Sequence, residues 1–170
     1  MNARAILARL RGFAAFDFCV GFLLFLDRLR AITFIMYREE SGICMAPRIF
    51  WIGDSTVQFN SIFTWPQCGM GQVLDLYVRP GIAVYDHARN GRSTKSFREE
   101  GLWTPVEDAL RPGDLLLIQF GHNDEKMNDP TRYASPEQFS ANLLAYARAA
   151  QAKGALPVLI TPLVRRHFEG

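Results

Sequence analysis

Short apolar runs alternate with segments of helical spacing along residues 45–170, and turn residues separate them. The apolar runs predict four strands, at about Arg48–Ile52, Ile82–Tyr85, Leu115–Phe120 and Pro157–Thr161. The third run is apolar along most of its length, which is typical of a strand that is covered on both faces. The pattern therefore indicates a sheet buried between other layers.

Helical patterns occupy the intervals between these strands. The predicted helices run from Pro66 to Val78, from about Ser96, from Thr104, and from Ser135 to Gly154. Thr104 and Ser135 each open a capping box with proline at the next position. The resulting order β-α-β-α-β-α-β predicts an α/β fold, with a parallel sheet, helices on both faces and right-handed crossovers.

Residues 1–44 do not continue this pattern. Basic residues precede the uncharged run Phe18–Leu26, which is shorter than the roughly 20 residues that a membrane span needs. An extension outside the fold, a signal or membrane-surface helix and a spanning helix all remain open for this segment. We therefore expect an N-terminal extension at 1–44 and one domain at 45–170.

Charge and cysteine content exclude some functions. The net charge is +2 and the basic residues are spread out, so we expect no nucleic-acid partner. Cys19, Cys44 and Cys68 form neither a disulfide framework nor a C-x-x-C metal pair. This usage favours a reducing compartment, so we expect a cytoplasmic protein. Secretion or membrane association through residues 1–44 is the alternative, and membrane contact is expected only there.

Polar or glycine-rich clusters follow three of the predicted strands. They are Gly53–Thr56, Asn90–Ser93 and Gly121–Asp124. The carboxyl ends of parallel strands meet at one edge of a sheet, where ligands bind in open α/β folds. Taken singly, each cluster also fits a turn or a helix cap. Their expected convergence favours one shared site.

The three clusters together supply the groups that acyl transfer requires. Ser55 is the candidate nucleophile, and the Gly91 N–H and the Asn123 amide are candidate donors for a developing oxyanion. The chain lacks G-x-S-x-G, because Val57 stands where that motif has its second glycine. It also lacks a dinucleotide loop, a P-loop and H-E-x-x-H.

In this combination and order, the clusters resemble the blocks of the SGNH (GDSL-type) hydrolases. They are most similar to the rhamnogalacturonan acetylesterase branch, which Thr161–Phe168 also resembles. The resemblance covers about Pro47–Phe168. It implies a flavodoxin-like three-layer α/β/α sandwich, no metal, no organic cofactor and an acetylated carbohydrate as the substrate. It further implies Ser55 as nucleophile, with an oxyanion hole formed by the Ser55 N–H, the Gly91 N–H and the Asn123 side chain.

Further residues are candidates for contact with the substrate. The resemblance places Gln58 and Met70 near the acyl or sugar pocket, although the branch often has tryptophan where Met70 stands. His122 and His167 are candidates for substrate contact, with a structural role as the alternative for His122. Asp54 is a candidate for substrate contact. Its residue type and position favour the alternative, in which its carboxylate accepts hydrogen bonds from loop N–H groups.

One part of the family pattern does not occur. The family takes its catalytic base from a later D-x-x-H segment, and these 170 residues contain no such motif. A fifth strand and a C-terminal helix are also missing from the pattern. We therefore expect a C-terminally truncated esterase domain, weak or inactive without its base. The alternative is a non-catalytic remnant that binds carbohydrate or another partner.

Overall fold

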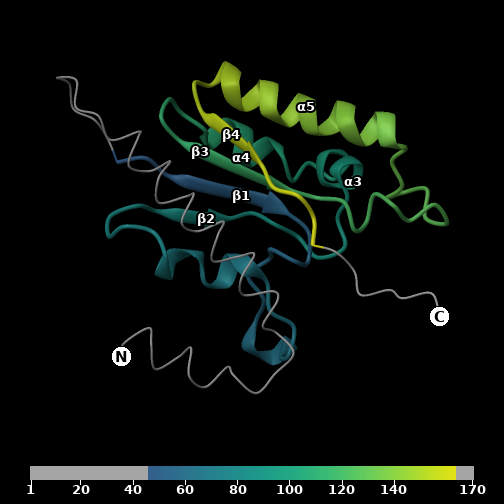
Figure 1. Cartoon of the computed structure of the whole chain (residues 1–170), viewed down its shortest axis with the longest axis horizontal. Coiled ribbons are helices and arrows are strands. Elements are labelled where there is room, and N and C mark those ends of the chain that lie inside the picture. The colour runs from purple at the N-terminus through teal and green to yellow at the C-terminus, as the bar shows by residue number, and fades with distance from the viewer. Residues whose placement is uncertain (1–45, 164–170) are drawn as a thin grey trace. The chain divides into compact units, whose positions relative to one another are not determined.

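The computed structural model describes residues 46–163, which form an α/β unit around one parallel sheet (Figure 1). The strands are β1 Ile49–Gly53, β2 Val84–Asp86, β3 Leu115–Gln119 and β4 Leu156–Leu159, in the order β2-β1-β3-β4. This order is that of the flavodoxin-like folds and confirms the predicted fold class. The predictions for residues 1–44 and for His167 lie outside the described residues.

The α-helices follow the predicted pattern with shifted starts. They are α3 Thr94–Glu99, α4 Thr104–Ala109 and α5 Pro136–Ala152. The capping box at Ser135 is present, whereas the one predicted at Thr104 is wrong, because Trp103 holds the N-cap position. Another capping box, formed by Ser93 and Ser96, starts α3 two residues earlier than predicted. Within residues 46–163, no helix has the length and apolar character needed to cross a bilayer.

The predicted helix from Pro66 to Val78 is wrong. This part of the chain forms short 3-10 helices, η2 Met70–Gln72 and η3 Leu74–Leu76, after η1 Ile62–Thr64. The Met70 and Gly71 N–H groups donate to the carbonyls of Thr56 and Val57, at 2.9 and 2.8 Å. Gly69 lies so close to the Val57 and Gln58 carbonyls that a side chain would not fit. Tertiary hydrogen bonds thus take two of the backbone donors that an α-helix would use.

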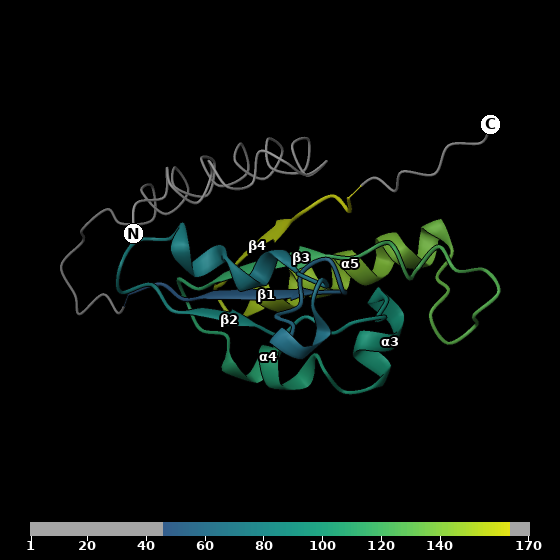
Figure 2. The same cartoon turned by 90° about the horizontal axis from the view of Figure 1, so that it is seen from below.

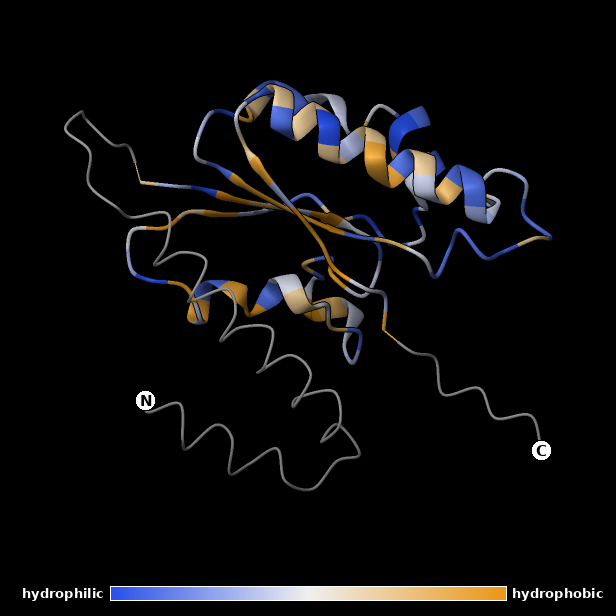
Figure 3. Cartoon of the chain, turned by 45° about the horizontal axis from the view of Figure 1, so that its top comes forward, coloured by the Kyte–Doolittle hydropathy of each residue, from blue (hydrophilic) through white to orange (hydrophobic). Residues whose placement is uncertain are grey.

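The main core lies between one face of the sheet and the three α-helices. Phe50, Ile52, Leu116 and Ile118 pack with α3, α4 and α5 residues. The opposite face is also buried along β1 and β3, since every residue of both strands is buried. Figure 2 shows α3 and α4 together on one side of the sheet, and Figure 3 shows the apolar strands between helical layers. Burial on both faces of β3 confirms the prediction from its apolar sequence.

The register of the central strands aligns their functional ends. β1 and β3 pair from Ile49 with Leu115 to Gly53 with Gln119. The last residue of β2, Asp86, pairs with Trp51. The loops after β1, β2 and β3 therefore leave the same edge of the sheet from adjacent strands.

An ion pair between the partly buried Arg48 and the buried Asp114 joins the starts of β1 and β3. Arg48 donates to Asp114 through Nη2 at 2.6 Å and Nε at 3.1 Å. The Arg48 and Arg111 backbone N–H groups donate to the same carboxylate, at 3.2 and 3.0 Å. Asp114 is 1% exposed, so its charge depends on these donors.

Replacing Asp114 by alanine should lower the free energy of unfolding by about 3 kcal/mol, because four donors lose their buried acceptor. Urea unfolding followed by circular dichroism measures this. Asp108→Ala is the matched control, since Asp108 is exposed on α4. Equal stability of the two variants would contradict the proposed role of the ion pair.

A second carboxylate fixes the loop after β1 to the end of β2. Asp86 accepts hydrogen bonds from the Phe59 N–H through Oδ2 and from the Ala88 N–H through Oδ1. Burial raises the pKa of Asp86 from 3.8 to about 6, although these bonds and Arg89 oppose the shift. The folded state therefore holds this proton more tightly than the unfolded chain does.

The stabilising contribution of protonated Asp86 is complete below pH 3.8 and is lost as the pH rises to about 6. Asp86→Asn cannot titrate, and its amide nitrogen cannot accept from one of the two N–H groups, so the pH dependence is the test. The stability of the variant relative to that of the wild type should rise by about 1 to 2 kcal/mol between pH 4 and 7, after allowance for solvent screening. Urea unfolding at several pH values measures the difference. Parallel stability curves for the two proteins would rule out this titration.

Candidate active site

Ser55 lies in a tight turn directly after β1. The N–H groups of Val57 and Gln58 both donate to the Asp54 carbonyl, at 3.1 and 3.0 Å, and close this turn. At Gly53 a side-chain carbon would lie 2.6 Å from the Gln119 carbonyl oxygen, so only glycine fits. Ser55 is partly exposed, and its hydroxyl has no hydrogen-bond partner among residues 46–163. The turn thus presents the hydroxyl at the carboxyl edge of the sheet.

Asp54 shapes the same turn from inside. Its carboxylate accepts from the Thr56 N–H at 2.9 Å and from the Thr56 hydroxyl at 2.8 Å. The residue is 1% exposed. Asp54 thus accepts a hydrogen bond from a loop N–H group, as its residue type and position predict. Contact of Asp54 with the substrate stays a prediction.

Gly91 lies in the turn Arg89–Arg92 after β2. Its φ of 76° is in the left-handed region, which glycine adopts without strain. The Arg89 N–H donates to the Gly53 carbonyl at 3.0 Å, and the Asn90 N–H donates to Gln58 Oε1. These bonds attach the Gly91 turn to the Ser55 turn. Gln58 therefore serves as a bridge between the two turns, and its contact with substrate stays a prediction.

Asn123 extends the arrangement from the end of β3. Its Nδ2 donates to the Arg92 carbonyl at 3.0 Å, and the residue is buried. An amide group carries two hydrogens, so this bond leaves one for another acceptor. The three predicted residues thus belong to loops that are hydrogen-bonded to one another. Their roles in catalysis stay predictions.

A buried polar network behind Asn123 was not predicted from the sequence. Asp124 Oδ1 accepts from both the N–H and the hydroxyl of Thr94, while the Thr94 hydroxyl accepts from Asn142 Nδ2 at 3.0 Å. The Tyr146 hydroxyl donates to the Thr94 carbonyl at 2.8 Å. Burial raises the pKa of Asp124, although its bonds from Thr94 oppose the shift. The sequence does not distinguish Thr94 from other residues at the start of a helix, because the residues to which it is hydrogen-bonded lie at least 30 positions away along the chain.

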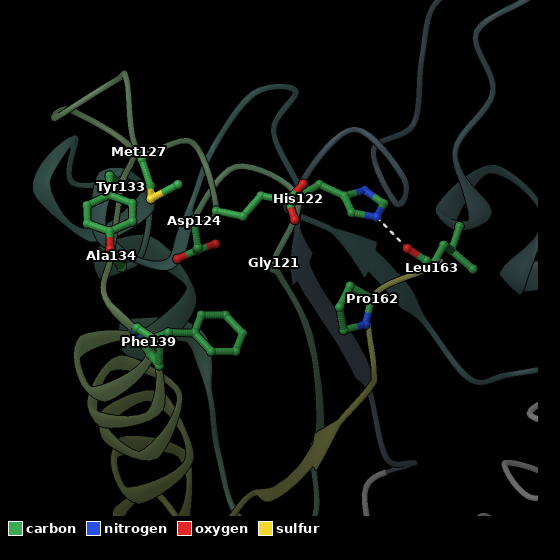
Figure 4. A pocket seen from close by; sticks show the side chains of 11 residues that line it. Gly121, His122, Asp124, Met127, Tyr133, Ala134, Phe139, Pro162 and Leu163 are labelled. Atoms are coloured by element: carbon green, nitrogen blue, oxygen red, sulfur yellow. Dashed lines mark hydrogen bonds between the residues drawn. The ribbon is translucent and has the colours of Figure 1, made fainter. Parts of the chain in front are cut away.

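A pocket of about 650 Å³ opens beside this network (Figure 4). Its walls include Met127, Tyr133, Phe139 and Pro162. Figure 4 shows the His122 ring turned toward Leu163, whose carbonyl bonds to His122 Nε2 at 2.5 Å. His122 thus lines the pocket. Its contact with the substrate stays a prediction.

The remaining candidates are placed less directly. Met70 is buried beside the Ser55 turn, to which its N–H is bonded through the Thr56 carbonyl. Among residues 46–163, no three His, Cys, Asp or Glu side chains form a group that could hold a metal ion.

Comparison with known proteins identifies relatives, although no family model matches the chain. It is 43% identical to the probable rhamnogalacturonan acetylesterase YesY of Bacillus subtilis over 126 residues, 74% of this chain and 58% of that protein. It is 41% identical to the rhamnogalacturonan acetylesterase RhgT of the same organism over 122 residues, 72% of this chain and 51% of that protein. The chain therefore spans about half the length of these curated relatives.

A solved structure shares the fold. The crystal structure of YxiM from Bacillus subtilis superposes with a TM-score of 0.62 at 30% identity, covering 68% of this chain and 32% of that chain. The similar sequences and the common fold agree with the three strand-end blocks described above. The chain belongs to the SGNH hydrolase family.

Proposed function

We propose that this chain carries the nucleophile and the oxyanion hole of a serine esterase that removes O-acetyl groups from carbohydrate. The single observation that carries the proposal is the hydrogen bonding of three strand-end loops around Ser55. Gln58 links the Ser55 turn to the Gly91 turn, and Asn123 links the Gly91 turn to the end of β3. The relatives named as rhamnogalacturonan acetylesterases support a substrate of that kind.

In the proposed reaction, Ser55 Oγ attacks the acetyl carbonyl carbon and its proton passes to a base. The carbonyl oxygen becomes an oxyanion, which accepts hydrogen bonds from the Ser55 N–H, the Gly91 N–H and Asn123 Nδ2. Collapse of this intermediate breaks the bond to the sugar oxygen, which takes the proton from the base and leaves as a hydroxyl, while an acetyl group stays on Ser55. Water then attacks that ester as the base takes its proton, and the same donors stabilise the second oxyanion. Its collapse releases acetate and returns the proton to Ser55 Oγ.

The base is the component that the described site does not supply. Among residues 46–163, no side chain forms a hydrogen bond with the Ser55 hydroxyl, and His122 is bonded to Leu163. We therefore expect a polypeptide of these 170 residues to turn over slowly.

The pocket next to Asn123 is the proposed place of the sugar. Tyr133 and Phe139 offer aromatic surfaces, while His122 and Asp124 offer polar groups. Pockets for small ligands commonly combine apolar walls with a few polar groups in this way. Because no residue of 46–163 is bonded to the Ser55 hydroxyl as a base, binding of carbohydrate without turnover is the second candidate function.

Replacing Ser55 by alanine should abolish acetate release from p-nitrophenyl acetate and from acetylated rhamnogalacturonan. Exogenous imidazole should raise the wild-type rate as a substitute base, beyond the background reaction of imidazole measured with Ser55→Ala. Ser140→Ala on α5 is the control, because the Ser140 hydroxyl is exposed and donates to the Pro136 carbonyl within its own helix. Equal rates for wild type and Ser55→Ala, with and without imidazole, would contradict the proposed esterase function.

Replacing Asn123 by alanine should lower kcat by roughly 10²- to 10³-fold, because one oxyanion donor is lost. The KM should change less, since the donor acts mainly on charge that develops in the transition state. Asn128→Ala is the control, because Asn128 is exposed in the same loop. A kcat for Asn123→Ala equal to that of the control would remove Asn123 from the oxyanion hole.

A further inference from the structure

The side chain of Arg92 binds the peptide group that carries the Gly91 N–H, the proposed oxyanion donor. Arg92 Nη1 donates to the Asn90 carbonyl at 2.9 Å. This carbonyl and the Gly91 N–H belong to one peptide group, which is trans and planar. The two therefore point in opposite directions, so a bond that fixes the carbonyl also fixes the direction of the N–H.

Glu100 holds the guanidinium of Arg92 in this position. Glu100 Oε2 accepts from Arg92 Nε at 2.9 Å and from Arg92 Nη2 at 2.8 Å. Glu100 is the C-cap residue of α3, and Arg92 directly precedes the N-cap residue Ser93, so the ion pair spans this helix. The guanidinium is planar, and the bonds to Glu100 occupy one of its edges. Nη1 is thereby directed to the Asn90 carbonyl.

The rest of the turn is held as well, while the Gly91 N–H stays available. The Asn90 N–H donates to Gln58 Oε1. A side-chain carbon at Gly91 would lie 3.6 Å from Arg132 Nη1, so a second guanidinium lies against the glycine. Among residues 46–163, the Gly91 N–H donates to no acceptor. The turn therefore has a fixed shape and keeps this donor for a ligand.

The backbone of Arg92 binds the other proposed loop donor. Its carbonyl accepts from Asn123 Nδ2 at 3.0 Å, so Arg92 contacts the groups that carry both donors. The side chains of Arg92 and Glu100 are 40% and 42% exposed. An exposed ion pair contributes little to the stability of a fold. Variants of the Arg92 side chain should therefore fold, and the position of the ion pair indicates a role at the site.

We propose that Arg92 is a positioning residue for the oxyanion hole and acts through the Asn90–Gly91 peptide group. This inference rests on the proposed function, because it concerns how the same site stabilises the oxyanion. A charged donor on a carbonyl polarises the peptide group, and hydrogen bonds that share a group strengthen one another. Arg92 thus directs the Gly91 N–H and makes it a stronger donor to negative charge that develops on the substrate.

The kinetic test uses the full 170-residue chain with p-nitrophenyl acetate, and with imidazole as the substitute base. Arg92→Ala should lower kcat about tenfold and change KM by less than about twofold, because the weakened donor acts mainly in the transition state. Arg92→Lys should have an intermediate kcat, because an ammonium group can still donate to the Asn90 carbonyl. Arg148→Ala is the matched control, because Arg148 is an exposed arginine on α5.

Two further measurements separate positioning from a structural role. The urea midpoint of Arg92→Ala should stay close to that of the wild type, because the ion pair is exposed. The nitrogen-15 NMR signal of the Gly91 amide should move in Arg92→Ala, because the carbonyl of its peptide group loses a hydrogen bond. Millimolar guanidinium chloride should move this signal back and raise kcat, whereas sodium chloride at the same concentration should do neither.

The proposal is overturned if the Gly91 signal does not move in Arg92→Ala. It is also overturned if the kcat of Arg92→Ala equals that of Arg148→Ala, or falls only in proportion to a loss of folded protein. The esterase proposal fails separately, through equal acetate release by wild type and Ser55→Ala. The Gly91 signal needs no turnover, so it still decides whether Arg92 holds this peptide group, and the two failures are distinguishable.

Discussion

The buried bond between Asp124 and Thr94 is the interaction on which the candidate site depends. Asp124 follows β3, and Thr94 begins α3, so this bond joins two loops that are 30 residues apart in sequence. It is surrounded by core, because the Tyr146 hydroxyl that bonds to Thr94 belongs to a buried ring. Asn123 and Gly91 lie on the two segments that it joins. A buried carboxylate without hydrogen-bond donors is costly in free energy, so the fold favours the loop arrangement in which Thr94 supplies them.

Close backbone approach is the second constraint on the site. The Ser55 turn packs so tightly on the end of β3 and on residues 69–71 that Gly53, Gly69 and Gly71 leave no space for side chains. The same contacts convert a segment of helical pattern into 3-10 turns. This segment therefore forms 3-10 helices in place of an α-helix, and its hydrogen bonds hold the turn that carries Ser55.

The proposed oxyanion donors and the proposed nucleophile differ from a base in how they are positioned. The donors lie on loops that leave adjacent parallel strands, and hydrogen bonds within the sheet edge hold them. A base would approach Ser55 from another part of a polypeptide, and residues 46–163 supply none that is bonded to it. Hydrogen bonds thus hold the loops of the proposed oxyanion donors, while no residue of 46–163 is bonded to the Ser55 hydroxyl.

Much of the fold was determined by local sequence patterns. The apolar run of β3, the capping box at Ser135 and the glycine-rich blocks after three strands have local physical causes, so they could be read directly. The convergence of Ser55, Gly91 and Asn123 on one edge follows from the parallel topology that these patterns predict.

Tertiary structure decided the features that depend on contacts between distant residues. Residues 66–78 carry helical spacing, yet the Met70 and Gly71 N–H groups bond to the carbonyls of Thr56 and Val57 in the Ser55 turn. Thr94 became the centre of a network, and Arg132 came to lie on Gly91, because folding joined loops that no periodic pattern connects. Propensity and spacing describe neighbours along the chain, whereas hydrogen bonds and close packing between loops arise only when the sheet brings their ends together.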